Sequence, residues 1–145
     1  MNLVLDTNVV LDWLVFRDPS MDLLERAVSE GRWRLITHQP ALDELRRVLG
    51  YPQFKLTAPE QSAILQSYQS RTVLAILPAT ESTLPAKFPR CRDADDQPFL
   101  ALAHHVRADA LVTKDKEVLR LRRQALKFGV TILDPAELPA GEVVE

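Results

Sequence analysis

Short apolar runs alternate with amphipathic stretches along the whole chain. Apolar runs of strand length, bounded by polar or turn-forming residues, predict buried β-strands. They lie at Leu3–Leu5, Trp33–Thr37, Val73–Leu77, Ala110–Thr113 and Val130–Leu133. Because helical stretches separate these runs, the pattern predicts an α/β fold with a mostly parallel central sheet and helices on both faces.

The stretches between the strands carry apolar residues at helical spacing. Thr57 and Glu60 form a capping box with Pro59 in the first turn, which predicts a helix from Ala58 to Ser70. The other predicted helices are Val9–Leu14, a segment from Ser20 to Gly31, Pro40–Leu49, a helix that opens near Pro98, Lys116–Leu126 and a short turn that starts at Asp134. Residues 78–92 carry no periodicity and predict a long connection of the kind that is functional or mobile.

Composition narrows the class of protein. A chain of 145 residues with 46% apolar residues is of ordinary size for one packed domain, so we expect a single domain over 1–145 with a frayed tail from about 139. No apolar stretch approaches the ~20 residues that cross a bilayer. The strand follows Met1 and Asn2 directly, without room for a signal peptide, and the lone Cys91 fits a reducing compartment. We therefore expect a cytoplasmic protein that does not contact the membrane.

Four acidic residues recur at matching places in the predicted fold. Asp6 and Asp115 each follow an apolar strand, Asp96 opens a helix, and Glu44 sits near the start of another helix. In a parallel sheet the strand ends and the following helix starts share one edge, so these acids can converge there. Two plainer alternatives stay open: Asp6 could only cap the helix that follows it, and Glu44, which lies off its helix's apolar stripe, could face solvent.

The residue types point to a hard cation. Carboxylates without histidine or cysteine partners are the ligands that Mg²⁺ or Mn²⁺ prefers, and one or two such ions can activate water against a phosphodiester. Three aspartates within residues 93–96 would also repel one another without cations. The net charge of −2 becomes +2 once the four acids are set aside, which permits a nucleic-acid substrate without indicating one. Neighbouring polar side chains could hold the carboxylates by hydrogen bonds; they are Thr7, Asn8 and Thr113.

The order of these motifs resembles the PIN-domain nucleases, most closely the bacterial branch assigned as toxins of toxin–antitoxin systems. The resemblance rests on short motifs spread over nearly the whole chain: Leu5-Asp6-Thr7-Asn8, Glu44 in a helix, Asp93-Ala94-Asp95-Asp96 before Phe99–Ala103, and Ala108–Asp115. It implies a three-layer α/β/α sandwich that cleaves single-stranded RNA with Mg²⁺ or Mn²⁺. The family's acids fall on Asp6, Glu44, Asp96 and Asp115, its polar residue after the first acid on Asn8, and an auxiliary ligand on Asp93.

One departure from the family pattern concerns access to the ion. Many relatives have glycine before the last acid and an aspartate two positions after it, whereas this chain has Lys114 and Glu117. Lys114 could narrow the way to the metal or contact phosphate. The other candidate substrate contacts are His38, Arg120 and Arg123. A lone histidine at a strand end is more often structural, and a basic set such as Arg120, Arg122, Arg123 and Lys127 is usually a solvated face. His104, His105 and Cys91 are expected to be structural.

The resemblance also implies a small antitoxin protein as partner, and a homodimer is the commonest arrangement for soluble proteins. Two other functions stay open at this point. A phosphatase or phosphotransfer domain would use Asp6 as a nucleophile. A non-catalytic PIN-like module would keep the fold only to bind another protein.

Overall fold

The computed structural model describes residues 1–76 and 84–139. Its centre is a sheet of parallel strands in the order β3-β2-β1-β4-β5. The strands are β1 (Asn2–Leu5), β2 (Arg34–Thr37), β3 (Thr72–Leu74), β4 (Ala110–Val112) and β5 (Ile132–Leu133). Leu3 of β1 pairs with Leu35 on one side and with Ala110 on the other. The predicted parallel α/β sheet is therefore confirmed.

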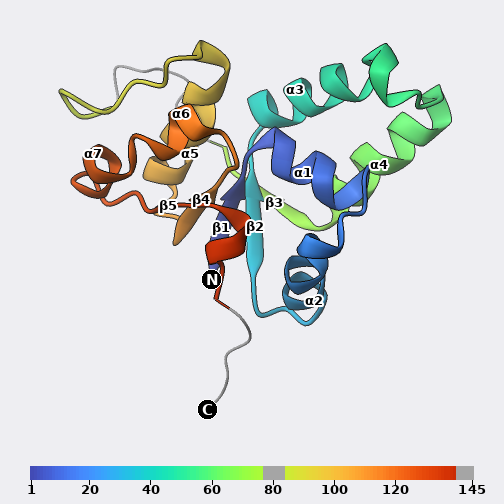
Figure 1. Cartoon of the computed structure of the whole chain (residues 1–145), viewed down its shortest axis with the longest axis horizontal. Helices are drawn as coiled ribbons and strands as arrows, with labels where there is room; N and C mark the ends of the chain where they lie inside the picture. The colour runs from blue at the N-terminus through green and yellow to red at the C-terminus, as the bar shows by residue number, and fades with distance from the viewer. Residues whose placement is uncertain (77–83, 140–145) are drawn as a thin grey trace.

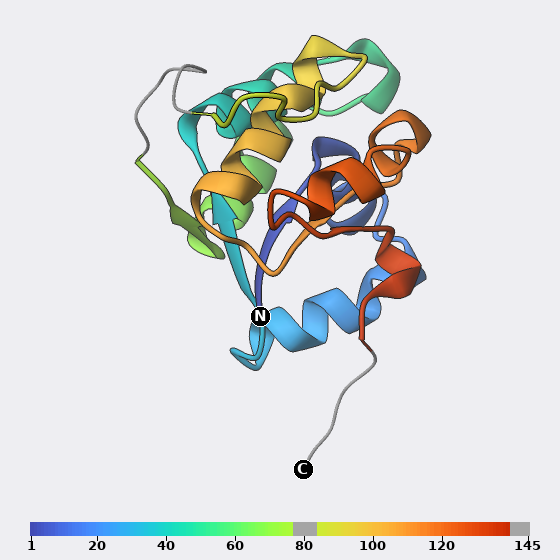
Figure 2. The same ribbon diagram turned by 90° about the vertical axis from the view of Figure 1, so that its left-hand side faces the viewer.

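Helices cover both faces of the sheet. They are α1 (Thr7–Leu14), α2 (Asp22–Ser29), α3 (Gln39–Leu49), α4 (Ala58–Ser70), α5 (Gln97–His105), α6 (Lys116–Leu119) and α7 (Arg122–Leu126). Figure 1 shows α1 to α4 on the right of the sheet and α5 to α7 on its left. Figure 2, from the left, shows the gold and orange helices α5 to α7 in front of the strands. The molecule is thus a three-layer α/β/α sandwich.

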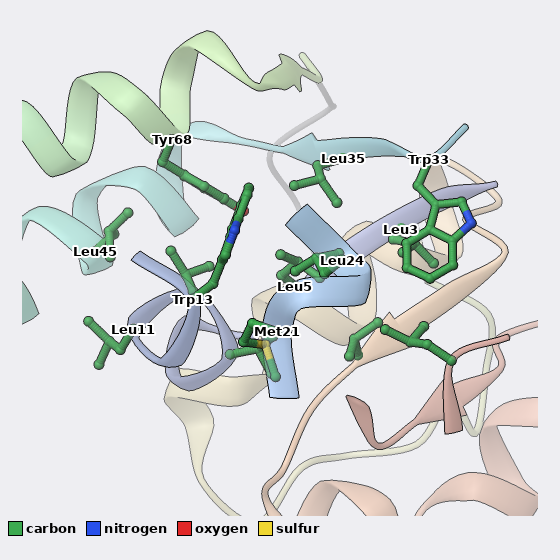
Figure 3. Close-up of a cluster of buried hydrophobic side chains, with 14 of the residues drawn as sticks. Leu3, Leu5, Leu11, Trp13, Met21, Leu24, Trp33, Leu35, Leu45 and Tyr68 are labelled. Carbon is green, nitrogen blue, oxygen red and sulfur yellow. The ribbon is translucent and has the colours of Figure 1, made fainter. Parts of the chain in front are cut away.

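Alternation along the strands divides the core in two. Leu3, Leu5 and Leu35 point to the face covered by α1, α2 and α4, where they pack with Trp13 and Tyr68 (Figure 3). The intervening residues point to the opposite face and pack against α5, α6 and α7; they include Val4, Ile36, Leu111 and Ile132. This period of two is what a sheet buried on both sides requires.

The helix predicted over Lys116–Leu126 is wrong as one continuous element. It is broken into α6 and α7 at Arg120 and Leu121. In the second half Ala125 is fully buried, whereas Leu126 is 64% exposed. Val118 and Ala125 both pack in the core on the side of the sheet that α5 covers.

The third strand is also shorter than predicted. It ends at Leu74, and because β3 lies at the edge of the sheet, Val73 and Leu74 remain about half exposed. Residue 77 of the predicted strand, residues 78–83 of the predicted connection and residues 140–145 of the predicted tail lie outside the described residues. No helix within the described ranges is long and apolar enough to cross a membrane.

Short 3₁₀ turns complete the path between the longer elements. They are Pro19–Met21, Pro52–Phe54, Ala94–Asp96 and Pro135–Glu137. The turn Ala94–Asp96 matters most for the site because it leads directly into α5. The sequence analysis predicted only the helix that opens near Pro98 and not this turn before it.

Candidate active site

The strand order creates a crevice beside β1. The chain passes from β1 to β2 and β3 on one side, then crosses back to β4 and β5 on the other. In open parallel sheets, ligands bind outside the carboxyl ends of the strands where the order reverses. Asp6 directly follows β1, Thr113 directly follows β4, and the Asp6 amide donates to the Val112 carbonyl at 2.9 Å. Asp6 therefore lies at this switch point.

Asp6 is held by a contact between these two strand ends. Its side chain is buried, and Oδ2 accepts a 2.7 Å hydrogen bond from the hydroxyl of the fully buried Thr113. Burial is the largest influence on the carboxyl and raises its pKa, while the Thr113 hydrogen bond lowers it and nearby Asp115 raises it again. Asp6 occupies the N-cap position of α1 without a well-formed capping hydrogen bond, although the Asn8 and Thr7 amides also lower its pKa. Its best-formed contact is therefore the one with Thr113, beside a weaker contribution to the start of α1.

Glu44 reaches the same edge from α3. The hydroxyl of Thr7, in the first turn of α1, donates a short hydrogen bond to Oε2 of Glu44. Arg47, one turn further along α3, places Nη2 3.6 Å from Oε1. The side chain is only 18% exposed, and burial, followed by repulsion from Asp6 and Asp95, raises the pKa of Glu44. Glu44 thus faces the crevice side of its helix rather than open solvent.

Asp96 is the site acid whose negative charge no hydrogen-bond donor offsets among the described residues. It ends the Ala94–Asp96 turn and precedes α5 without making a capping hydrogen bond. No donor bonds its carboxylate among the residues that the structure describes. Burial raises the pKa of Asp96 to about 7, and the surrounding carboxylates add to the effect; in order they are Asp6, Asp115, Asp93 and Glu44. All of these acids therefore act on one another at a single edge of the sheet.

The remaining two acids are engaged in local turns. Asp115 caps α6 through a 2.8 Å hydrogen bond from the Glu117 amide, and its own amide donates to the Thr113 hydroxyl. Asp93 caps the Ala94–Asp96 turn by accepting from the Asp95 amide, and its side chain is exposed. Both carboxylates are thereby fixed near the crevice by the backbone that follows them.

The acids lie near one another but are not arranged as the ligands of one metal ion. Within residues 1–76 and 84–139, no three acidic, histidine or cysteine side chains are placed to hold one metal ion. Four of the carboxylates, those of Asp6, Glu44, Asp93 and Asp115, each accept a hydrogen bond from a different donor. The donor set nevertheless fits a hard divalent cation, since it is composed of carboxylate oxygens whose mutual repulsion a cation would relieve.

The candidate substrate contacts differ in where their side chains lie. Lys114 turns away from the acids and pairs with Asp12 of α1, with Nζ and Oδ2 2.5 Å apart. His38 is buried at the N-terminus of α3, where Nδ1 accepts from the Ala41 amide, and burial lowers its pKa. Arg120 makes two contacts with Glu117 at 2.6 and 3.1 Å. Arg123 on α7 and Asn8 at the start of α1 are exposed.

Two residues near the site were missed by the sequence analysis. Gln97 is buried at the start of α5, where Oε1 accepts from the Cys91 amide and Nε2 donates to the Pro89 carbonyl. It thereby ties the segment before the acidic run to α5. Arg47 lies between Glu44 and Asp95 and borders a cavity of about 360 Å³ between α3 and the start of α5. The spacing of three residues from Glu44 was the signal that could have identified Arg47.

Comparison with known families agrees with this architecture. The family model of the PIN domain matches residues 2–117, which include Asp6, Glu44, Asp96 and Asp115. The chain therefore belongs to the PIN-domain family, whose members are generally metal-dependent nucleases that act on RNA. Arg120 and Arg123 lie beyond the matched segment. No curated protein matches the chain.

Proposed function

We propose that this chain is a Mg²⁺- or Mn²⁺-dependent endoribonuclease that hydrolyses phosphodiester bonds of single-stranded RNA. The observation that carries the proposal is the buried Asp6 carboxylate at the sheet's switch point, within the field of Asp96 and Asp115. A structural protein gains nothing from repelling acids in such a place. A nuclease needs them to bind a cation.

Several acids would bind the ion together. Asp6, Glu44, Asp96 and Asp115 would hold it, with Asp93 as an auxiliary ligand. A bound Mg²⁺ or Mn²⁺ supplies a Lewis acid that polarises the phosphodiester and lowers the pKa of water. Hydrogen bonds from Thr113 to Asp6 and from Thr7 to Glu44 favour the ionised form of each carboxyl and orient it. Asp96, which has no competing donor, is free to turn toward the ion.

The proposed biological role follows from the family branch that the motifs resemble. We propose that the chain is the toxin of a toxin–antitoxin pair, works in the cytoplasm, forms a homodimer and is neutralised by a small antitoxin protein. A small gene beside the one for this chain, whose product co-purifies with it and blocks RNA cleavage, would support this role. An isolated gene without such an inhibitor would count against it.

The proposed chemistry is tested by RNA cleavage with purified protein. We expect cleavage of single-stranded RNA that requires Mg²⁺ or Mn²⁺ and falls by at least about a hundredfold in Asp6→Asn or Asp96→Asn. Asp43→Asn is the matched control, because Asp43 is an exposed acid beside Glu44 that pairs with Gln39 and Arg46. It should leave cleavage unchanged.

Other outcomes of the same assay would overturn the proposal. A phosphorylated Asp6 without RNA cleavage would indicate a phosphotransfer enzyme. Absence of both cleavage and cation binding would indicate a protein-binding module that retains only the fold. Cleavage that persists in Asp6→Asn and Asp96→Asn would show that the acids are not the catalytic residues.

A further inference from the structure

Three aromatic rings cluster near the C-terminal ends of α1 and α3, where two of them are stacked and the third is tilted against one of these. Tyr51 lies parallel to Phe54, with an interplanar angle of 7° and ring centroids 6.4 Å apart, and Phe16 meets Phe54 at 5.8 Å. Phe54 packs against the core and anchors the group, whereas Phe16 is 57% and Tyr51 39% exposed. We call these three residues the aromatic ledge.

The aromatic ledge lies in line with the proposed active site. Figure 1 shows α1 and α3 both leading away from the carboxyl edge of the sheet toward its right-hand side. Glu44 lies on α3, which ends at Leu49, and Tyr51 follows two residues later, with its amide still donating to the Val48 carbonyl. The helix therefore leads from Glu44 to the aromatic ledge, with a rise of about 8 Å between Glu44 and the end of α3.

Positive charges accompany this path. Arg47 stands between Glu44 and Tyr51, and its side chain remains 57% exposed despite its long contacts with Glu44 and Asp95. Arg17 follows Phe16 directly, and Lys55 follows Phe54. Both are exposed, and neither has an ion-pair partner in the part of the chain that the structure describes. Unpaired cations beside exposed rings complement a negatively charged backbone that carries flat bases.

We propose that Arg47 and the aromatic ledge form a track for the single-stranded RNA whose cleavage is proposed above, with Arg47 on a phosphate and the rings under unpaired bases. The rise of about 8 Å between Glu44 and the end of α3 corresponds to about two nucleotides at a stacked rise of about 3.4 Å. Because every base has a π-face, this contact adds affinity with little dependence on sequence. The inference rests on the proposed ribonuclease function for the identity of the ligand.

The test measures RNA binding apart from cleavage. Asp6→Asn serves as the background, so that a labelled single-stranded RNA of about ten nucleotides stays intact while its fluorescence anisotropy is followed. In that background, Tyr51→Ala and Phe16→Ala should each weaken binding by about 5- to 100-fold. Tyr51→Trp keeps a ring and should bind like the parent. Leu126→Ala, which removes an exposed apolar side chain on α7, should change nothing.

The two arginines of α3 give a matched comparison for the phosphate contact. Arg46 and Arg47 are adjacent and about equally exposed, but they point to different sides of the helix. Arg47→Ala should weaken RNA binding and reduce the slope of log affinity against log salt by about one. Arg46→Ala should leave both quantities unchanged.

The outcomes separate this inference from the proposed function. If the wild type cleaves RNA but the ledge variants and Arg47→Ala bind RNA normally, the track is wrong and the ribonuclease stands. If the ledge variants lose RNA binding while no preparation cleaves RNA, the track stands and the nuclease proposal fails. If the variants keep RNA affinity and instead lose a protein partner, the ledge is a protein-docking surface and the inference is overturned.

Discussion

The hydroxyl of Thr113 donates a 2.7 Å hydrogen bond to Oδ2 of Asp6, across 107 residues of sequence. It joins the ends of β1 and β4, the neighbouring parallel strands between which the order of the strands reverses. The bond favours the ionised form of a carboxyl whose pKa burial raises. Thr113 therefore helps to keep a buried acid charged at the point where the cation is proposed to bind.

Removal of this hydroxyl should destabilise the protein in a pH-dependent way. Thr113→Val leaves the Asp6 carboxylate without its donor, so we expect the free energy of unfolding to fall by about 1–3 kcal/mol at neutral pH. The loss should shrink in acid, where Asp6 is protonated and no charge is left uncompensated. Urea unfolding of the metal-free protein at both pH values measures this difference.

Thr113→Ser is the control for that experiment, because it keeps the hydroxyl. It should restore most of the stability at neutral pH and bind Mn²⁺ better than Thr113→Val, whose affinity we expect to be about 10–100-fold below that of the wild type. Equal behaviour of the serine and valine variants would show that Thr113 acts through packing alone.

The raised pKa of Asp96 predicts how stability varies with pH. The ordinary value of 3.8 applies to the unfolded chain, whereas the folded value is about 7. Between about pH 4 and pH 7 the unfolded chain releases this proton while the folded protein retains it, so the Asp96 contribution lowers the free energy of unfolding as pH rises.

Asp96→Asn removes this contribution without changing the size of the side chain. In metal-free protein, we expect the variant to gain about 1–2 kcal/mol over the wild type between about pH 4 and pH 8, since solvent screens part of the repulsion. Excess Mg²⁺ should then favour the wild type. A difference between the two proteins that stays constant with pH would contradict the assigned repulsion.

The position of Lys114 predicts a small effect at the site. Its ammonium pairs with Asp12 on α1 and lies near Asp18 and Asp134 rather than near the candidate ligands. Lys114→Ala should cost less than about 1 kcal/mol of stability, because the pair is exposed. It should also leave Mn²⁺ affinity within about twofold of the wild type. A large gain in Mn²⁺ affinity, measured by titration, would show that Lys114 does restrict the ion.

Burial in the central sheet determines how strongly a core mutation lowers the free energy of unfolding. Leu35 of β2 is fully buried between its neighbours β1 and β3, so Leu35→Ala should lower the free energy of unfolding by about 2–5 kcal/mol. Leu126→Ala deletes an equally large but 64% exposed side chain and should change it by less than about 0.5 kcal/mol. Denaturant unfolding would measure both changes, provided that the dependence of the free energy of unfolding on denaturant concentration is the same in the variants as in the wild type.

The sequence was most informative where local rules and burial agree. The capping box at Thr57 and Glu60 predicted where α4 begins. The alternation of apolar runs with helical stretches predicted a parallel sheet between two layers of helices. The break between α6 and α7 was not predictable, because Val118, Leu121 and Ala125 keep the spacing of one continuous helical face. Apolar periodicity alone therefore does not locate it.

In the site, positions along the chain could be predicted from the sequence, whereas contacts between distant elements could not. The positions of Asp6 and Asp115 at strand ends followed from the pattern, as did Thr113 beside them. The partners of Glu44 did not, since the Thr7 hydroxyl reaches it only because α1 and α3 pack together. Nor could the sequence show which backbone amides Asp93 and Asp115 accept from, because these contacts depend on the turns that follow them.

Direct measurement of Mn²⁺ binding at a pH above 7 tests the account most directly. Electron paramagnetic resonance of free Mn²⁺ counts the ions that the protein removes from solution. We predict saturable binding to the wild type and to Asp43→Asn, with affinity at least about tenfold weaker in both Asp6→Asn and Asp96→Asn. Equal affinity in all four proteins, or no binding to any of them, would contradict the claim that these acids form a cation site.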